Sequence, residues 1–187
     1  MKYLVINFLA FEMGWFACVW GAANDMPWLA LVAAVIIIWF HLASAEKPSR
    51  EVRLIVLAVA MGLVFDSLLV SSGWLKYPSG MILPGVAPYW IIAMWAMFAT
   101  TMNSSMCWIK SNLALAAVMG AVFGPLSYMA GQRIGGLEFI DTRASIIALA
   151  VIWGIAMPLL VIAAKRFDGV KKFQPTLPLP GLLRRWP

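Results

Sequence analysis

Residues 3–21, YLVINFLAFEMGWFACVWG, decide the fold: they form an apolar stretch in which Glu12 is the only side chain that carries a formal charge. About 20 such residues are needed for a helix to cross the hydrocarbon core of a bilayer, so this stretch predicts a transmembrane helix. Further apolar stretches follow along the chain. Together they predict six spans, at residues 3–21, 27–44, 52–70, 89–109, 113–132 and 145–164.

The composition agrees with a membrane protein. Hydrophobic residues make up 63% of the 187 residues, charged residues make up 12%, and the mean hydropathy is +0.88. Such a chain is too apolar for a soluble domain. We therefore expect an all-α, polytopic bundle of six transmembrane helices over residues 1–166, followed by a proline-rich, basic cytoplasmic tail over residues 167–187.

The basic residues predict the orientation of this bundle. If the N-terminus is cytoplasmic, 11 of the 14 lysines and arginines lie on the cytoplasmic side, and only Lys76, Arg133 and Arg143 lie on the other. Cytoplasmic loops carry such an excess of basic residues, so both termini are expected in the cytoplasm. Because these residues flank spans and form no groove-reading motif, the net charge of +6 predicts no nucleic-acid partner.

The sequence predicts neither a metal site nor a cofactor. His41 is the only histidine, so one chain cannot supply a bis-histidine haem site or a histidine-rich di-iron site. No CxxC, HExxH, GxSxG or Walker motif occurs. Function is therefore sought among the polar side chains within the spans.

Glu12 lies near the middle of its span, where a carboxylate is costly unless it meets a polar partner or a cavity. In the fourth predicted span, the i, i+3, i+4, i+7 spacing of Thr100, Asn103, Ser104 and Cys107 places them on one helical face. Two interpretations of this face remain open. It packs helices closely through small and hydroxylated side chains, or it forms the polar wall of a ligand cavity that faces Glu12, with Thr100, Asn103 and Ser104 as ligand-binding residues.

A second polar layer is expected in the outer half of the bundle. It contains Asp66, Tyr128, Gln132 and Arg133, whose depths match at a helical rise of about 1.5 Å per residue. Opposite charges attract strongly in a medium of low polarity, so we predict that Asp66 pairs with Arg133. The turn-rich loop of residues 73–88 is expected to close over this layer. Asp66 then either fixes two helices or takes part in ligand binding or catalysis.

The fifth predicted span carries a small-residue motif. Gly120 and Gly124 form a GxxxG pattern, which favours close approach of another helix. Pro125 follows directly and predicts a kink, because proline removes one hydrogen bond of the helix. The glycine face is a candidate docking surface for a partner protein or for a second copy of the chain.

Residues 124–135, GPLSYMAGQRIG, and residues 95–102, WAMFATTM, resemble an uncharacterised family of small bacterial inner-membrane proteins, a domain of unknown function with the motif GPLxYxAGxRxG. The similarity covers nearly all of the chain before the tail. It implies location in the inner (cytoplasmic) membrane. It also implies a lipid-related setting, because genes of this family often neighbour genes for fatty-acyl lipid modification. It implies no activity and identifies no catalytic residue.

Three functions remain open at this stage. The leading one is binding or processing of a hydrophobic small molecule, with an acyl lipid as one candidate, in a polar cavity within the membrane. If the protein is an enzyme, Asp66 or Glu12 supplies the acid or base, Tyr128 or Arg133 stabilises charge, and Gln132 helps to bind the ligand. The alternatives are a small transporter that acts as a dimer and a non-catalytic accessory subunit of a membrane complex. Membrane lipids are expected partners in each case.

Overall fold

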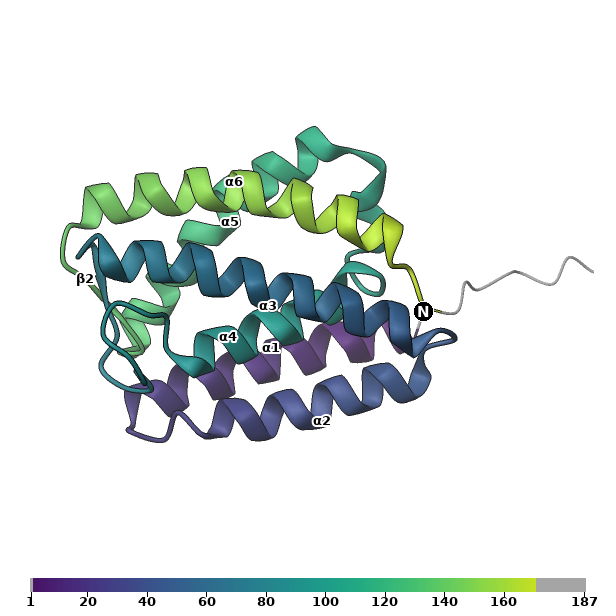
Figure 1. The fold of residues 1–187 in the computed structure, drawn as a ribbon, viewed down its shortest axis with the longest axis horizontal. Coiled ribbons are helices and arrows are strands. Elements are labelled where there is room, and N and C mark those ends of the chain that lie inside the picture. Colours follow the sequence, from purple (N-terminus) through teal and green to yellow (C-terminus); the bar gives the residue numbers. More distant parts are fainter. Residues whose placement is uncertain (1, 171–187) are drawn as a thin grey trace, which may run out of the picture.

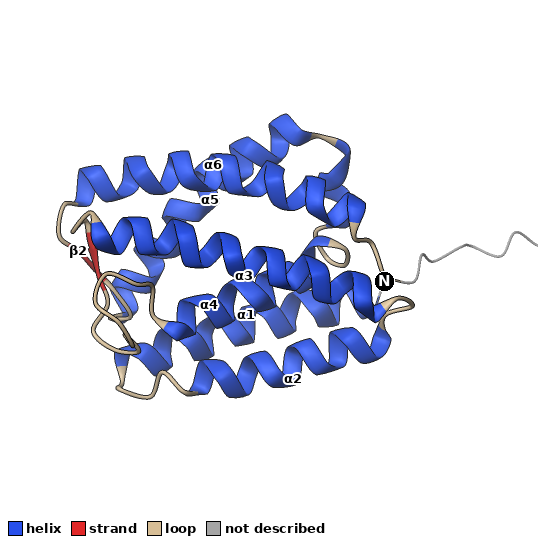
Figure 2. Ribbon diagram, viewed as in Figure 1, coloured by secondary structure: helices blue, strands red, loops and turns tan. Residues whose placement is uncertain are grey.

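A computed structural model describes residues 2–170 of the chain. Its elements are the helices α1 (Lys2–Ala23), α2 (Leu29–Ser44), α3 (Pro48–Ser71), α4 (Tyr89–Met102), α5 (Leu113–Ile134) and α6 (Thr142–Arg166), the 3-10 helix η1 (Cys107–Ser111), and the short strands β1 (Leu75–Lys76) and β2 (Glu138–Phe139). Figures 1 and 2 show the long helices running roughly side by side. The prediction of an all-α helical bundle is confirmed; the predicted tail lies mostly outside the described residues.

Four of the helices, α1, α3, α5 and α6, are each long enough and apolar enough to cross a bilayer, which is consistent with a membrane protein. The other two are shorter, with 16 residues in α2 and 14 in α4. At a rise of 1.5 Å per residue these span roughly 24 and 21 Å, whereas the hydrocarbon core measures about 30 Å. Helix α4 ends at Met102, whereas the fourth span was predicted to continue to residue 109. The predicted span is too long at its C-terminal end.

Polar residues account for this early end of α4. The backbone N–H groups of Asn103, Ser104 and Met106 all donate to the carbonyl of Thr101, so the chain turns instead of continuing the helix. Asparagine and serine side chains compete with the helical backbone for hydrogen bonds. Cys107 consequently lies exposed at the start of η1, and the predicted four-residue face is not continuous.

Helix α4 is the centre of the bundle. It contacts α1, α2, α3 and α6, and most of its side chains are buried. Helix α5 instead packs mainly against α6. There, a Cβ atom at Gly120 or Gly124 would overlap Trp153 of α6. The glycine motif thus packs α5 against α6 within the chain, and a partner that docks through the Gly120/Gly124 face stays a prediction.

The bundle has two distinct ends. At the loop end, β1 and β2 pair antiparallel, with Leu75 opposite Phe139, so the α3–α4 connection meets the α5–α6 connection. At the terminal end, the carbonyl of Gly169 accepts hydrogen bonds from the backbone N–H groups of Glu46 and Lys47. The α2–α3 turn therefore lies beside the segment that follows α6, and the start of α1 lies at the same end (Figure 1).

Candidate functional site

An apolar cavity of about 330 Å³ lies between α1, α4, α5 and α6. It forms because α5 packs against α6 and leaves space beside α4. Aromatic and methionine side chains dominate its lining: Phe11, Trp15, Trp95, Phe98, Phe123, Trp153, Met94, Met106, Met119 and Met157. Among the described residues, the lining side chains with a polar group are the tryptophans, Glu12, Ser127 and Tyr128. A cavity is found, but the prediction that it is polar is wrong, and of the predicted site residues only Glu12 and Tyr128 line it.

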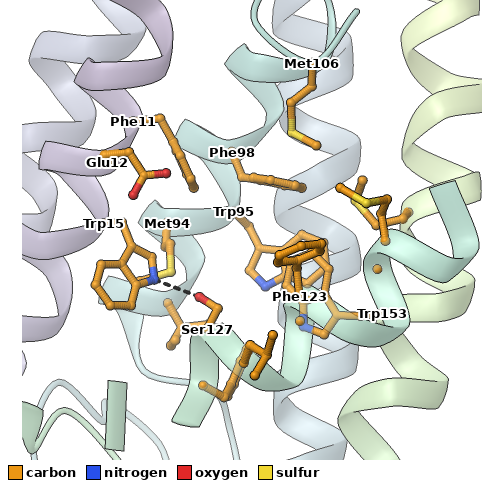
Figure 3. Close-up of a pocket in the computed structure, with 17 residues that line it drawn as sticks. Phe11, Glu12, Trp15, Met94, Trp95, Phe98, Met106, Phe123, Ser127 and Trp153 are labelled. Atoms are coloured by element: carbon orange, nitrogen blue, oxygen red, sulfur yellow. Dashed lines mark hydrogen bonds between the residues drawn. The ribbon is translucent and has the colours of Figure 1, made fainter. Parts of the chain in front are cut away.

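Aromatic rings on three helices form a connected wall of this cavity (Figure 3). The ring centroids of Phe11 and Phe98 lie 5.5 Å apart, and Phe98 meets Trp153 edge-on at 5.6 Å. Trp153 then stacks on Trp95 with centroids 4.6 Å apart and an interplanar angle of 11°. Offset stacks and edge-to-face pairs are favourable arrangements of aromatic rings. The wall is therefore held in a defined shape by contacts among its own rings.

A hydrogen bond joins α1 to α5 beside the cavity. The indole Nε1 of Trp15 donates to the Oγ of Ser127 at 3.0 Å, as Figure 3 shows. Both residues line the cavity. This bond gives the indole N–H of the half-buried Trp15 an acceptor within the bundle.

Glu12 lies on the α1 side of the cavity (Figure 3). Trp15 follows it by three residues, so the two side chains share one face of the helix. The Glu12 side chain is exposed, and within residues 3–170 it has no hydrogen-bond or ion-pair partner. Of the two surroundings expected for Glu12, a polar partner or a cavity, it has the cavity, and the polar face of the fourth predicted span does not line that cavity.

The α1 residue that does meet the polar end of α4 is Asn7, which is not among the predicted site residues. Its Nδ2 donates to the carbonyl of Thr100 at 3.3 Å, and its Oδ1 accepts from the Oγ of Ser105 at 2.7 Å. Asn7 precedes Glu12 by five residues, which places it roughly 140° away around the helix axis. Helix α1 therefore turns Asn7 toward the α4 terminus and Glu12 toward the cavity.

The predicted ligand-binding residues of the fourth span take part in packing and lie outside the cavity lining. The Oγ1 of Thr100 donates back to the carbonyl of Met97 at 2.7 Å, within its own helix. The Nδ2 of Asn103 donates to Glu51 at 2.8 Å. Ser104 is fully buried, and its Oγ has no partner among the described residues. Of the two interpretations of this face, the structure agrees with helix packing.

The outer polar layer is organised around Asp66, which is only 1% exposed. Its carboxylate accepts hydrogen bonds from Tyr128, from the hydroxyl of Tyr77 at 3.1 Å and from the Nε1 of Trp95 at 2.7 Å. The predicted proximity of Asp66 and Tyr128 is correct. Tyr77 lies between β1 and α4, so the loop also reaches this layer as predicted. Burial raises the pKa of Tyr77, and the negative charge of Asp66 raises it further. The phenol of Tyr77 therefore stays neutral and acts as a hydrogen-bond donor.

The predicted ion pair between Asp66 and Arg133 is wrong. Arg133 is exposed in the last turn of α5, and Gln132 beside it is exposed as well. Arg133 follows Tyr128 by five residues, which turns its side chain roughly 140° away from the one that reaches Asp66. The depth of a residue along its helix correctly predicted that Tyr128 lies near Asp66. Depth alone does not give the direction of a side chain around the helix axis, and Arg133 points away from Asp66.

Trp95 connects the Asp66 layer to the cavity, because its ring lines the cavity while its Nε1 binds Asp66. Gly62 lies one turn before Asp66, and a Cβ atom there would overlap the Trp95 indole. Glycine therefore makes room for the ring, and Asp66 fixes its orientation. Asp66 is best described as a positioning residue for the cavity wall.

A second buried carboxylate, Glu51, organises the terminal end and was missed by the sequence analysis. It is fully buried, and its Oε2 lies 2.9 Å from Nε2 of His41. Its Oε1 accepts from Asn103 and, at 2.6 Å, from the backbone N–H of Gly169. Glu51 closely follows Lys47 and Arg50 in the sequence. Charged residues grouped in this way are typical of a solvent-exposed helix start, so burial of Glu51 was not predicted. The available signal was the only histidine of the chain, ten residues earlier.

The side chains at the cavity suit binding better than acid–base or metal chemistry. Within the described part of the chain, no group of three or more histidine, cysteine, aspartate or glutamate side chains is placed to hold a metal ion. Glu12 is the one carboxylate that lines the cavity, and Tyr128 directs its hydroxyl to Asp66. What the geometry offers is an apolar, aromatic surface with one unpaired carboxylate.

Comparison with known proteins identifies a family but no activity. The family model described as "Protein of unknown function (DUF2878)" matches residues 4–159, a range that extends from the start of α1 into the last turns of α6. This agrees with the resemblance to an uncharacterised family. Neither the curated proteins nor the solved structures gave a match.

Proposed function

Since the chain belongs to the DUF2878 family of proteins of unknown function, membership names no ligand, and we propose from the cavity itself that the protein binds a hydrophobic small molecule within the membrane. The observation that carries this proposal is the aromatic and methionine lining of the 330 Å³ cavity. Ligand pockets of roughly 300–1,000 Å³ with mostly apolar walls and a few polar groups are typical of small-molecule sites. An acyl lipid is one candidate occupant.

The rim of the cavity supports entry from the lipid phase. Phe123 and Leu126 on α5 line it, yet they are 55% and 49% exposed. In a bilayer these apolar surfaces face acyl chains. A hydrophobic molecule dissolved in the membrane would therefore reach the cavity between helices without crossing water.

The membrane setting of this proposal is a six-span protein in the inner membrane of a bacterium, with both termini in the cytoplasm. The distribution of charge over the described residues supports this orientation. Basic residues at the terminal end are Lys47, Arg50, Arg53, Lys110, Lys165 and Arg166, and those at the loop end are Lys76, Arg133 and Arg143. Single cysteines at positions 47 and 84, in a chain without Cys18 and Cys107, test it. Impermeant maleimide should label position 84 but not position 47 in intact cells, and the reverse result would overturn this topology.

The binding proposal is tested by photolabelling with a neutral probe. The protein in zwitterionic lipid nanodiscs is exposed to a diazirine-bearing fatty alcohol, irradiated and digested, and adducts are located by mass spectrometry. We expect labelling of cavity residues on α1, α4 and α5 that saturates and that unlabelled decanol competes away. Labelling that is spread over all lipid-facing residues and does not saturate would contradict the proposal.

A cavity-filling variant supplies the control. Met94 lines the cavity, so Met94→Trp should remove the saturable labelling by occupying the space. Met61 on α3 is also half-buried but does not line the cavity, so Met61→Trp should retain it. Equal labelling of both variants would place the probe elsewhere.

A further inference from the structure

We propose that the ligand of this cavity is a hydrophobic organic cation, such as an alkylammonium compound, with Glu12 as its counter-ion. This inference rests on the proposed function, because it names the chemical class that the same cavity accepts. It follows from the charge, the partners and the aromatic surroundings of Glu12.

Among the described residues, Glu12 is the only lining side chain that carries a formal charge. Neither a lysine nor an arginine occurs among the side chains that line it. Along the sequence, no lysine or arginine lies between Lys2 and Lys47, and His41 in that interval is buried against Glu51. Residues 3–170 thus place no positive charge in the cavity to balance Glu12, and a bound cation would supply it.

The other carboxylates within the bundle show what Glu12 lacks. Asp66 has three side-chain donors, and Glu51 has His41, Asn103 and a backbone N–H. Charged groups at membrane depth are expected to face a partner or a water-filled cavity. Glu12, near the middle of α1, differs from Asp66 and Glu51 in being exposed: it lies in the lining of the apolar cavity and has no partner among residues 3–170. A carboxylate in that position is arranged for a group that arrives from outside the chain.

The aromatic wall favours a cation over the other partners that a carboxylate accepts. A neutral alcohol could donate one hydrogen bond to Glu12, but it gains nothing from the ring faces. A cation is also attracted by the negative faces of aromatic rings, and aromatic side chains around a quaternary ammonium group are a recurrent recognition mode. Phe11 and Trp15 lie on the same helix as Glu12, and Phe98 packs against Phe11. A fatty-acid carboxylate, by contrast, would be repelled by Glu12.

The test compares three ligands that share one chain and differ in the charge of the head group. Decyltrimethylammonium, decanol and decanoate compete separately with the neutral diazirine alcohol in zwitterionic nanodiscs. For the wild-type chain we expect the cation to displace the label at the lowest concentration and decanoate at the highest. The three competitors partition differently into the bilayer, so their concentrations are compared as the amount of each bound per lipid; for one competitor this amount is the same for all variants, because the lipid is the same.

Glu12→Gln removes the charge and keeps the shape, so it should raise the concentration of decyltrimethylammonium needed for displacement at least tenfold. Displacement by decanol should change much less, because the amide oxygen of the substituted side chain still accepts the hydrogen bond of an alcohol; saturable labelling shows that the variant is folded. Glu46→Gln, an exposed carboxylate at the terminal end, is the matched control and should behave as the wild type. The inference is overturned if decanol competes as well as the cation, or if Glu12→Gln weakens both equally. An absence of saturable labelling would instead contradict the proposed function.

Discussion

Tyr128→Phe tests whether Asp66 holds the outer layer of the bundle together. The substitution removes one oxygen atom and keeps the ring. Tyr128 is 7% exposed and its hydroxyl donates to the Asp66 carboxylate, so water cannot easily replace the lost donor. Asp66 retains Tyr77 and Trp95 as donors.

The expected size of the effect follows from these contacts. A hydrogen bond to a charged group contributes about 1.5–3 kcal/mol to stability, and leaving a buried acceptor unsatisfied costs a similar amount. Because two donors remain, we expect the unfolding free energy to fall by about 2 kcal/mol. Tyr89→Phe is the matched control, since Tyr89 is half-buried and its hydroxyl has no hydrogen-bond partner among the described residues. It should change stability by less than about 0.5 kcal/mol.

Equilibrium unfolding by SDS in mixed micelles measures these differences. A double-mutant cycle with Asp66→Asn separates the pair from effects of each residue alone, because residues that interact directly give non-additive changes. If Tyr128→Phe costs no more than Tyr89→Phe, or if its effect simply adds to that of Asp66→Asn, the Asp66 network does not stabilise the bundle as described.

Three further predictions concern stability in the same SDS assay. Glu51→Ala leaves a buried histidine and a backbone N–H without their acceptor and should cost about 3–5 kcal/mol, whereas Glu46→Ala at an exposed position should be nearly neutral. Gly124→Ala should destabilise by about 1–3 kcal/mol, because the new Cβ overlaps Trp153. Gly154→Ala, whose Cβ would lie 3.5 Å from its nearest neighbour, should be neutral or stabilising by up to about 1 kcal/mol; the opposite order would show that α5 and α6 do not pack as described. The raised pKa of Tyr77 should leave stability unchanged up to the ordinary tyrosine value of 10.0 and lower it above that pH, because only the unfolded chain then loses the proton. Tyr77→Phe should weaken that alkaline decline in a series from pH 7 to 11, and an unchanged decline would refute this assignment.

Much of the fold could be predicted because hydropathy is a local property. A window of about 20 residues is enough to recognise a span, and the helices begin and end near the predicted limits except in α4. The same local reasoning identified Glu12 and Asp66 as exceptional, since a carboxylate inside an apolar helix is costly wherever it points. Depth along the helix also placed Tyr128 beside Asp66.

The sequence by itself thus determined the class of protein, the helices, and which polar residues require an explanation. Only the tertiary structure decided what those residues meet. The rotation of each helix about its axis, which depends on packing against all of its neighbours, turned Asn7 to α4 and Glu12 to the cavity. Rotation also left Arg133 exposed and directed Trp95 to Asp66, whereas Tyr77 reaches Asp66 from the loop between β1 and α4. The cavity lies beside the contact that α5 makes with α6 through Gly120 and Gly124. The sequence of a single span does not show which other helix it packs against.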